Sequence, residues 1–339
     1  MSTATTNRQF RLAARPVGMP KRSDWELTTE PVAEPGEGQV LVQVQYLSLD
    51  PAMRGWMNEG RSYIPPVGIG EVMRASGAGR VVASRHPDFA AGDDVTGILG
   101  IQEYAVLDGD KLTKVDASIV PLPVYVGVLG MTGMTAYFGL LDVGKPEAGQ
   151  TVVVSGAAGA VGTIVGQIAK IKGCRVVGIA GGAEKCRFIV DELGFDAAVD
   201  YKSENVAKAL RAQCPKGIDV YFDNVGGDVL DACLVNLARR ARVVLCGAIS
   251  QYNATAGVKG PSNYMMLLVT RSRMEGFVVF DYADRYAEGA RQLAQWLKEG
   301  KLKSREDIVK GFESFPETLL KLFAGDNVGK LILEVGGGE

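Results

Sequence analysis

The sequence predicts an α/β protein with two domains: one mostly β, the other built on a doubly wound parallel sheet. Three observations support this class. The chain has 339 residues, more than the roughly 150 of a typical single domain. Its first ~127 residues favour short β-strands. From about Thr151 onward, short β-branched runs alternate with helical segments, which is the pattern of βαβ units.

The N-terminal part has the patterning of half-buried strands. Valine alternates with glutamine along Gln39–Tyr46, so one face of this strand is apolar and the other is polar. Further short strands are predicted at Gly79–Ser84, Asp94–Leu99 and Glu103–Leu107. A last strand is predicted at Val328–Val335, and we expect the chain to return there to its first domain.

The second part alternates strands with helices. Strands are predicted at Thr151–Ser155, Arg175–Ala180, Ala197–Val199, Asp219–Phe222 and Arg242–Cys246. Helices are predicted at Ala160–Lys172, Glu184–Leu193, Glu204–Gln213, Val229–Leu237 and Asp284–Glu299. Since parallel strands need crossover connections, this order predicts one parallel sheet with helices on both faces.

Composition excludes several classes of function. The formal net charge is −2, so no basic surplus indicates nucleic acid or an anionic membrane as a partner. The only histidine is His86, and the five cysteines, at 174, 186, 214, 233 and 246, form no CxxC pair. We therefore expect no zinc site and no disulfide framework. Because the N-terminus shows no apolar signal-peptide segment, we expect a cytoplasmic location.

A glycine turn is the strongest local feature. The strand Thr151–Ser155 runs into Gly156, Gly159 and Gly162, and a helix follows. Small residues let the backbone approach a pyrophosphate, and the helix N-terminus supplies N–H groups and a positive dipole end. The same glycines also allow close packing of helix on strand without any ligand. The strand–turn–helix context favours a dinucleotide cofactor.

The end of the second strand indicates which dinucleotide. An NAD site carries an acidic residue there for the ribose hydroxyl, and Ile179–Gly182 contains none. Lys185 and Arg187 follow closely, and a 2′-phosphate needs such cations. Glu184 fits a first helical turn, where a negative charge meets the helix dipole. The sequence therefore favours NADPH over NADH.

Seven sequence blocks in order resemble one family. They are Leu47–Arg54, Leu129–Leu141, the glycine turn, Gly173–Gly178, Tyr221–Gly227, Cys246–Asn253 and Gly325–Lys330. These blocks are similar to the zinc-independent medium-chain dehydrogenases/reductases, in particular the NADPH-dependent double-bond reductases: prostaglandin, alkenal and bacterial curcumin reductases. The resemblance implies a GroES-like, mostly-β catalytic domain (residues 1–127 with 306–339) and a Rossmann NADP-binding domain (residues 128–305). It also implies a homodimer joined through sheet edges of the nucleotide domain.

The resemblance assigns roles to matching positions. The pyrophosphate would lie on Gly159, Ala160, Val161 and Gly162. The 2′-phosphate region of the cofactor would lie on Lys185 and Tyr201. The rest of NADPH would contact Asn224, Cys246, Gly247, Ala248, Ile249, Ser250, Tyr252, Phe277, Val278, Val279 and Asn327. Tyr252 matches the tyrosine that binds the substrate carbonyl.

The implied reaction transfers hydride to the β-carbon of a small-molecule α,β-unsaturated ketone or aldehyde. Charge then develops on the carbonyl oxygen as an enolate, which is less basic than an alkoxide, so a hydrogen bond from Tyr252 can replace a metal ion. Three alternatives remain: reduction of quinones by NADPH, a binding protein that keeps its nucleotide site, and a zinc dehydrogenase. Tyr252 itself can equally be a half-buried tyrosine bonded to backbone.

Several other positions carry weaker predictions. Ala52 stands where relatives commonly have tyrosine, near the substrate, so substrate preference differs from that pattern. Tyr63, Tyr264 and Met265–Leu268 fit either an apolar substrate cleft or the core. His86 precedes a proline in a predicted surface loop and is not expected to be catalytic. The cysteines are expected to be mainly small core residues.

Overall fold

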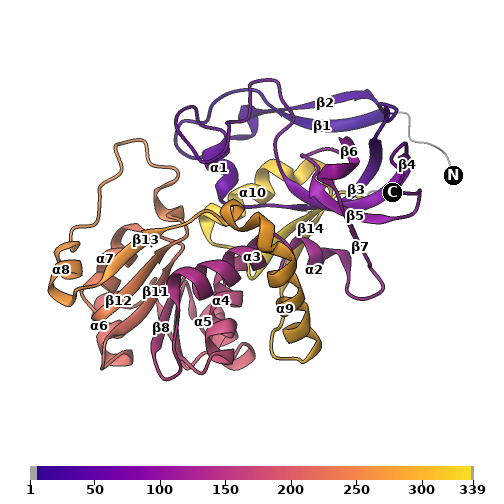
Figure 1. Cartoon of the computed structure of the whole chain (residues 1–339). Coiled ribbons are helices and arrows are strands. Elements are labelled where there is room, and N and C mark those ends of the chain that lie inside the picture. The colour runs from indigo at the N-terminus through magenta and orange to yellow at the C-terminus, as the bar shows by residue number, and fades with distance from the viewer. Residues whose placement is uncertain (1–5, 337–339) are drawn as a thin grey trace. The chain divides into compact units, whose positions relative to one another are not determined.

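The computed structural model describes residues 6–336. The chain divides into two compact units (Figure 1). One unit comprises the chain up to Gly127 together with the segment from Glu306, and the other comprises Val128–Arg305.

The first unit is rich in β-structure. A hairpin pairs β1 (Thr6–Leu12) with β2 (Trp25–Pro31). A seven-stranded sheet follows the order β14-β15-β3-β4-β5-β7, and β6 also pairs with β3. Its strands are β3 (Gln39–Ser48), β4 (Ser76–Ser84), β5 (Asp94–Ile98), β6 (Tyr104–Asp108), β7 (Thr113–Val115), β14 (Glu306–Lys310) and β15 (Lys330–Glu334). Since β15 pairs with β3, the C-terminal segment completes this sheet.

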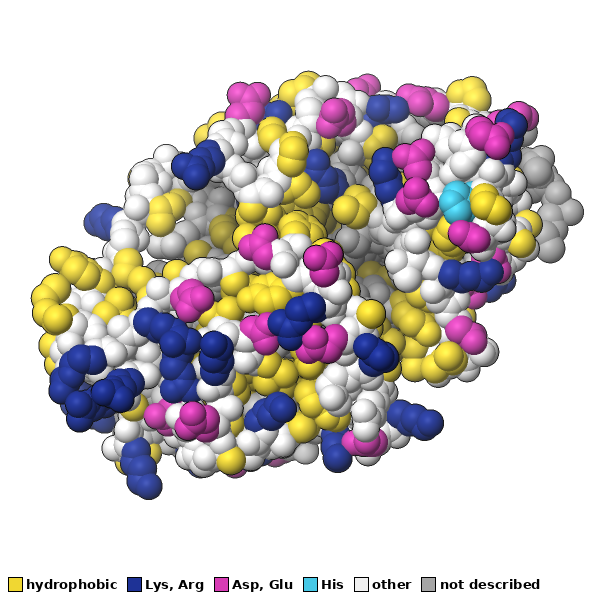
Figure 2. All heavy atoms as spheres, in the orientation of Figure 1, with side chains coloured by type: hydrophobic (Ala, Val, Ile, Leu, Met, Phe, Trp, Pro, Cys, Tyr) yellow, Lys and Arg dark blue, Asp and Glu magenta, His cyan; other side chains and the backbone are white. Residues whose placement is uncertain are grey.

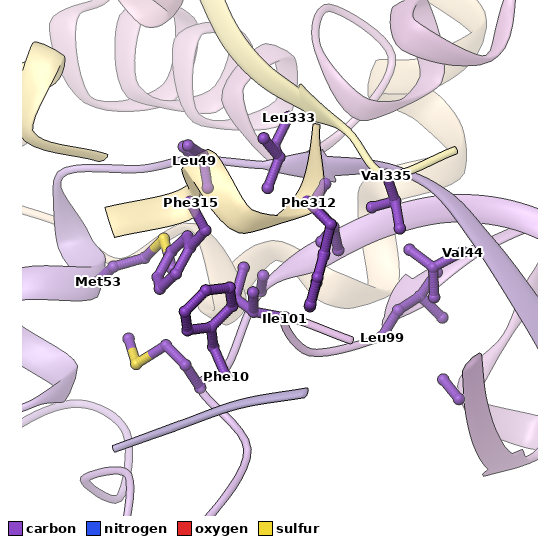
Figure 3. Packing of buried hydrophobic residues seen from close by; sticks show 14 of the residues in the cluster. Phe10, Val44, Leu49, Met53, Leu99, Ile101, Phe312, Phe315, Leu333 and Val335 are labelled. Atoms are coloured by element: carbon purple, nitrogen blue, oxygen red, sulfur yellow. The ribbon is translucent and has the colours of Figure 1, made fainter. Parts of the chain in front are cut away.

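Aromatic residues from both ends of the chain share the core of this unit (Figure 3). The ring of Phe10 lies 5.2 Å from each of the rings of Phe312 and Phe315. Trp25 meets Phe315 edge to face at 5.1 Å. The helices here are α1 (Ala52–Trp56), α2 (Leu122–Val126) and α10 (Phe315–Ala324). Burial of these large rings ties the N-terminal hairpin to α10.

The second unit is a doubly wound parallel sheet with the order β10-β9-β8-β11-β12-β13. Its strands are β8 (Thr151–Ser155), β9 (Arg175–Ala180), β10 (Ala197–Asp200), β11 (Ile218–Asp223), β12 (Leu237–Leu245) and β13 (Arg273–Gly276). Its helices are α3 (Met131–Phe138), α4 (Ala160–Ile171), α5 (Ala183–Arg187), α6 (Val206–Gln213), α7 (Gly227–Leu234), α8 (Met265–Thr270) and α9 (Tyr286–Lys298). The predicted fold class is confirmed, and the strand order reverses between β8 and β11, where such sheets bind ligands.

The two boundaries predicted around β12 are wrong. The helix predicted to reach Leu237 ends at Leu234, and Leu237 begins β12. The strand was predicted to start only at Arg242 because the charged pair Arg239 and Arg240 interrupts its apolar pattern. Arg240 has a φ of +63°, and β11 and β12 change register beside it. This irregularity turns the two arginines to the exposed surface while the chain stays in the sheet.

Candidate active site

The turn between β8 and α4 has room only for small residues. Gly156 follows Ser155 with a φ of +59°, and Gly159 precedes the first helical residue, Ala160. A Cβ atom added at Gly162 would lie 2.2 Å from the carbonyl oxygen of Gly156. Only glycine therefore fits at this position of the first helical turn, and its absence of a side chain lets α4 start close to the strand end.

The N-terminus of α4 suits an anion. This helix has 12 residues, and neither an acidic side chain nor a side-chain cap stands at its first turn, Ala160–Gly162. The first N–H groups of a helix lack intrahelical partners and carry the positive end of its dipole. A Cβ atom added at Gly159 would approach only the Gly156 carbonyl oxygen, at 3.2 Å. The residues predicted for the pyrophosphate, including Val161, thus form a turn that fits such a group.

The end of β9 lies beside an aromatic ring. Gly181 and Gly182 separate this strand from α5. A Cβ atom added at Gly181 would lie 2.7 Å from the ring of Tyr201, so the ring lies against this backbone. Tyr201 follows β10 and is 45% exposed, which leaves part of the ring open to a ligand. The structure thereby brings Tyr201 to the strand end where the adenosine part of a dinucleotide is expected.

Asp200 stabilises the same strand end. Its Oδ1 accepts hydrogen bonds from the N–H groups of Gly182 at 2.7 Å and Lys202 at 3.0 Å, and its Oδ2 accepts one from the Ser203 hydroxyl at 2.9 Å. The bond from Gly182 is the largest of the hydrogen bonds that lower the pKa of Asp200. Lys185, half-buried in α5, is the predicted cation for a 2′-phosphate.

The ends of β8 and β11 are joined by side chains. Asn224 donates its backbone N–H to the Ser155 hydroxyl at 3.0 Å and its amide Nδ2 to the Ser155 carbonyl at 2.7 Å. The preceding residue, Asp223, is fully buried and accepts a hydrogen bond from the Ser155 hydroxyl at 3.0 Å. Ser155 and Asp223 were not predicted as site residues. The available signal was a carboxylate ending an apolar strand directly before Asn224.

The Cys246–Tyr252 loop is bound to the β11 turn through its backbone. The N–H groups of Cys246 and Gly247 donate to the Asp223 carbonyl at 2.9 and 3.0 Å. Further along, the N–H groups of Ile249 and Ser250 donate to the carbonyls of Asn224 and Val225, both at 3.2 Å. The loop therefore runs beside the β11–α7 turn, and most of the cofactor positions predicted in this unit lie at one end of one sheet.

Tyr252 is the last residue of this loop. Its phenol oxygen accepts a hydrogen bond from the Ala248 N–H at 3.1 Å. A Cβ atom added at Gly247 would lie 2.8 Å from the same oxygen, so the ring depends on a glycine beneath it. A phenol oxygen that accepts a hydrogen bond can still donate its own O–H, because a phenol is both donor and acceptor. The arrangement fixes the oxygen of Tyr252 at the carboxyl end of the parallel strands.

The segment after β13 is placed by packing. A Cβ atom added at Gly139 would lie 2.4 Å from the Phe277 ring, which also meets Phe222 edge-on at 6.3 Å. The carbonyl of Val279 accepts a hydrogen bond from the Tyr286 hydroxyl at 3.0 Å. The Phe277 side chain is thus used in packing, so any cofactor contact of Phe277 is better suited to its backbone.

The β-rich unit carries the remaining predicted positions. Asn327 lies before β15 and donates its amide to the Gly329 carbonyl at 3.0 Å. Ala52 begins α1. Tyr63 is 55% exposed and does not belong to the core. His86 lies at the surface of this unit (Figure 2, cyan), with its ring nitrogens 3.6 Å or more from the nearest carboxylates.

The candidates on α8 divide between core and surface. Met266 and Leu267 pack against the core of the second unit. Tyr264, Met265 and Leu268 are 57%, 51% and 68% exposed. This short helix thus has one partly buried face and one exposed apolar face.

The cysteine thiols are held in the protonated form. Burial raises the pKa of Cys246 to about 12, and the charge of Asp223 adds to the effect. Burial likewise raises the pKa of Cys214 to about 11 and that of Cys233 well above its ordinary value. Because the thiolate is the reactive form, these residues are not suited to nucleophilic catalysis.

Two known sequence families match this chain. Residues 8–115 match a sequence family described as the N-terminal domain of oxidoreductase, and residues 160–296 match one described as zinc-binding dehydrogenase. An NADPH-dependent curcumin reductase of Escherichia coli is 48% identical over 98% of both chains. A 2-alkenal reductase (NADP(+)-dependent) of Nicotiana tabacum is 42% identical over 99% of both. The chain belongs to the medium-chain dehydrogenases/reductases, in the group of the curcumin and alkenal reductases.

Two solved structures have the same fold as this chain. CurA of Vibrio vulnificus in complex with NADPH is 46% identical, with a TM-score of 0.93 over 98% of this chain and 100% of that chain. The E. coli quinone oxidoreductase complexed with NADPH is 20% identical, with a TM-score of 0.77 over 97% of this chain and 99% of that chain, which shows a common fold alone.

The superfamily includes zinc enzymes, and one matching family is described by that metal. Among residues 6–336 of this medium-chain dehydrogenase/reductase, no group of three or more His, Cys, Asp or Glu side chains lies close enough together to hold a metal ion. Within the same range, no helix combines the length and apolar character needed to cross a membrane.

Proposed function

We propose that this chain uses NADPH to reduce the C=C bond of α,β-unsaturated ketones or aldehydes. The observation that carries the proposal is the connected set of strand ends in the second unit, where the β8 glycine turn, Asn224 and the loop of Tyr252 are joined by hydrogen bonds. Its similarity to NADP-dependent curcumin and alkenal reductases supports this chemistry.

The residues fit NADPH by size and charge. The turn from Gly159 to Gly162 would hold the pyrophosphate at the α4 N-terminus, and Lys185 with Tyr201 would hold the 2′-phosphate region. Asn224, Cys246–Ser250, Tyr252, Phe277–Val279 and Asn327 would contact the rest. When bound, NADPH supplies a hydride to the β-carbon of the substrate.

Tyr252 is the proposed catalytic residue. Negative charge develops on the substrate carbonyl oxygen as the β-carbon is reduced, and a phenol O–H aimed at that oxygen stabilises the charge. The hydrogen bond from Ala248 to the phenol oxygen fixes the position of this donor in advance. A substrate that lacks a conjugated carbonyl develops no such charge, so it should react poorly.

The test is a screen of NADPH oxidation with enones, enals and quinones, followed by identification of products. We expect enones to give saturated ketones. Hydroquinone from quinones with inert enones would instead support quinone reduction. Tight NADPH binding without turnover of any substrate would support a binding protein. We further propose that the protein is a homodimer, which analytical sedimentation tests. We also propose a cytoplasmic location, which cell fractionation tests.

A further inference from the structure

Asp223 is a buried carboxylate on which several segments converge. It ends β11 and is 0% exposed. Its Oδ1 accepts hydrogen bonds from the hydroxyls of Ser155 at 3.0 Å and Tyr221 at 2.7 Å, and from the N–H groups of Val225 and Gly226, both at 2.9 Å. A single oxygen atom thus gathers four donors from β8, β11 and the turn after β11.

The backbone carbonyl of Asp223 binds the end of β12. It accepts hydrogen bonds from the N–H groups of Cys246 and Gly247 at 2.9 and 3.0 Å. These two residues begin the loop of Tyr252. Side chain and carbonyl together therefore connect the three strand ends that are proposed to contact the cofactor.

The second carboxylate oxygen, Oδ2, has a different environment. It is buried and has no hydrogen-bond partner among residues 6–336. A buried carboxylate oxygen without a donor adds no stability, so the contribution of this side chain comes from Oδ1. An asparagine could present one oxygen to the same four donors, whereas an alanine presents none.

We propose that Asp223 is a positioning residue for the cofactor, whose Oδ1 and carbonyl hold the glycine turn, the Asn224 turn and the Tyr252 loop in the arrangement that binds NADPH. The proposal rests on the NADPH part of the proposed function. Asp223 acts through the segments that it binds, because it is itself buried.

The test is the dissociation constant of NADPH, measured by nucleotide fluorescence without substrate. Asp223→Ala should weaken binding about 30-fold, because four donors lose their acceptor. Asp223→Asn should stay within about threefold of wild type, because one oxygen remains for those donors. This rescue by an amide separates the hydrogen-bonding role from the charge.

Asp219 offers a matched control. It lies on the same strand, and its Oδ2 accepts the Thr151 N–H at 2.8 Å, at the opposite end of β8. Asp219→Ala should lower thermal stability and leave NADPH affinity within about threefold of wild type. A purely structural role for Asp223 predicts instead that the loss of NADPH affinity in each alanine variant follows its loss of thermal stability.

Three results would overturn the proposal: an Asp223→Ala protein that binds NADPH like wild type, an equal loss in Asp219→Ala, or an Asp223→Asn protein as weak as the alanine variant. If Asp223→Ala does not fold, Ser155→Ala replaces it, with an expected loss of about fivefold; unchanged affinity there contradicts the proposal. Since no enone is present, wild-type protein that binds NADPH but reduces no enone contradicts only the proposed reaction.

Discussion

At the scale of single residues, the proposed chemistry depends on a few polar groups held by backbone. Tyr252, Asn224 and Lys185 could be proposed from the sequence because each follows a predicted strand end, and their roles stay predictions. The carboxylate at the end of an apolar strand was too weak a signal to single out Asp223 or Ser155, because their importance comes from hydrogen bonds between strands that are distant in sequence. Such pairing is decided by the sheet order and is not visible locally.

Replacing Tyr252 by phenylalanine tests the donor directly. Tyr252→Phe should lower kcat on enones by about 10- to 1000-fold, the usual effect of losing one oxyanion donor. The dissociation constant of NADPH should stay nearly unchanged. Steady-state kinetics and nucleotide titration measure the two quantities, and an unchanged kcat would remove Tyr252 from the mechanism.

Replacing Lys185 by alanine tests the choice of cofactor. A hydrogen bond to a charged group contributes about 1.5–3 kcal/mol. Lys185→Ala should therefore weaken the binding of NADPH by about 10- to 100-fold and should change the binding of NADH little. Lys202→Ala, which removes an exposed lysine next to Tyr201, is the control. Equal losses for NADPH and NADH would contradict the assignment of Lys185 to the 2′-phosphate.

At the scale of elements, the strands of the second unit could be predicted most accurately, because buried β-branched runs end at glycine turns. The predicted bounds of β8 and β9 coincide with the observed ones. The hairpin β1–β2 had no such signal. Its polar residues Asn7 and Gln9 are buried, and the side chain of Gln102, which is 93 residues from Gln9, accepts from both.

The glycine turn makes a prediction of its own. Because an added Cβ at Gly162 would lie 2.2 Å from a backbone oxygen, Gly162→Ala must displace the turn. Overpacking of this kind costs about 1–3 kcal/mol of stability. We expect at least about tenfold weaker NADPH binding, since the turn would no longer match the pyrophosphate. Thermal unfolding and titration measure both effects.

The control is Gly55→Ala in α1, where an added Cβ meets nothing within 4 Å. This variant should be as stable as wild type or more so, by about 0.4–1 kcal/mol. If Gly162→Ala behaves like Gly55→Ala, the steric account of the turn is wrong.

At the scale of the whole molecule, burial makes the fold sensitive to alkaline pH. Burial raises the pKa of Cys214 to about 11 and that of Cys233 well above its ordinary value, and both side chains are almost inaccessible. An unfolded thiol has a pKa of about 8.5. Above that pH the unfolded chain releases these protons and the folded chain keeps them, so the free energy of unfolding falls.

Each of these two thiols should lower the free energy of unfolding by about 1.4 kcal/mol per pH unit between about pH 8.5 and its folded pKa. Denaturant unfolding between pH 7 and 10.5 measures this slope. Cys214→Ala should reduce the slope, while the thiols of Cys233 and Cys246 continue to contribute to it. A free energy of unfolding that does not change over this range would contradict the account.

The proposed function depends on transfer of hydride to the β-carbon of a conjugated carbonyl compound. The most direct measurement uses NADPH that carries deuterium at both hydrogens of nicotinamide C4, with wild-type protein and an aryl enone, and locates the label by NMR. We expect a saturated ketone with one deuterium on the β-carbon. Deuterium on the carbonyl carbon of an allylic alcohol would contradict it.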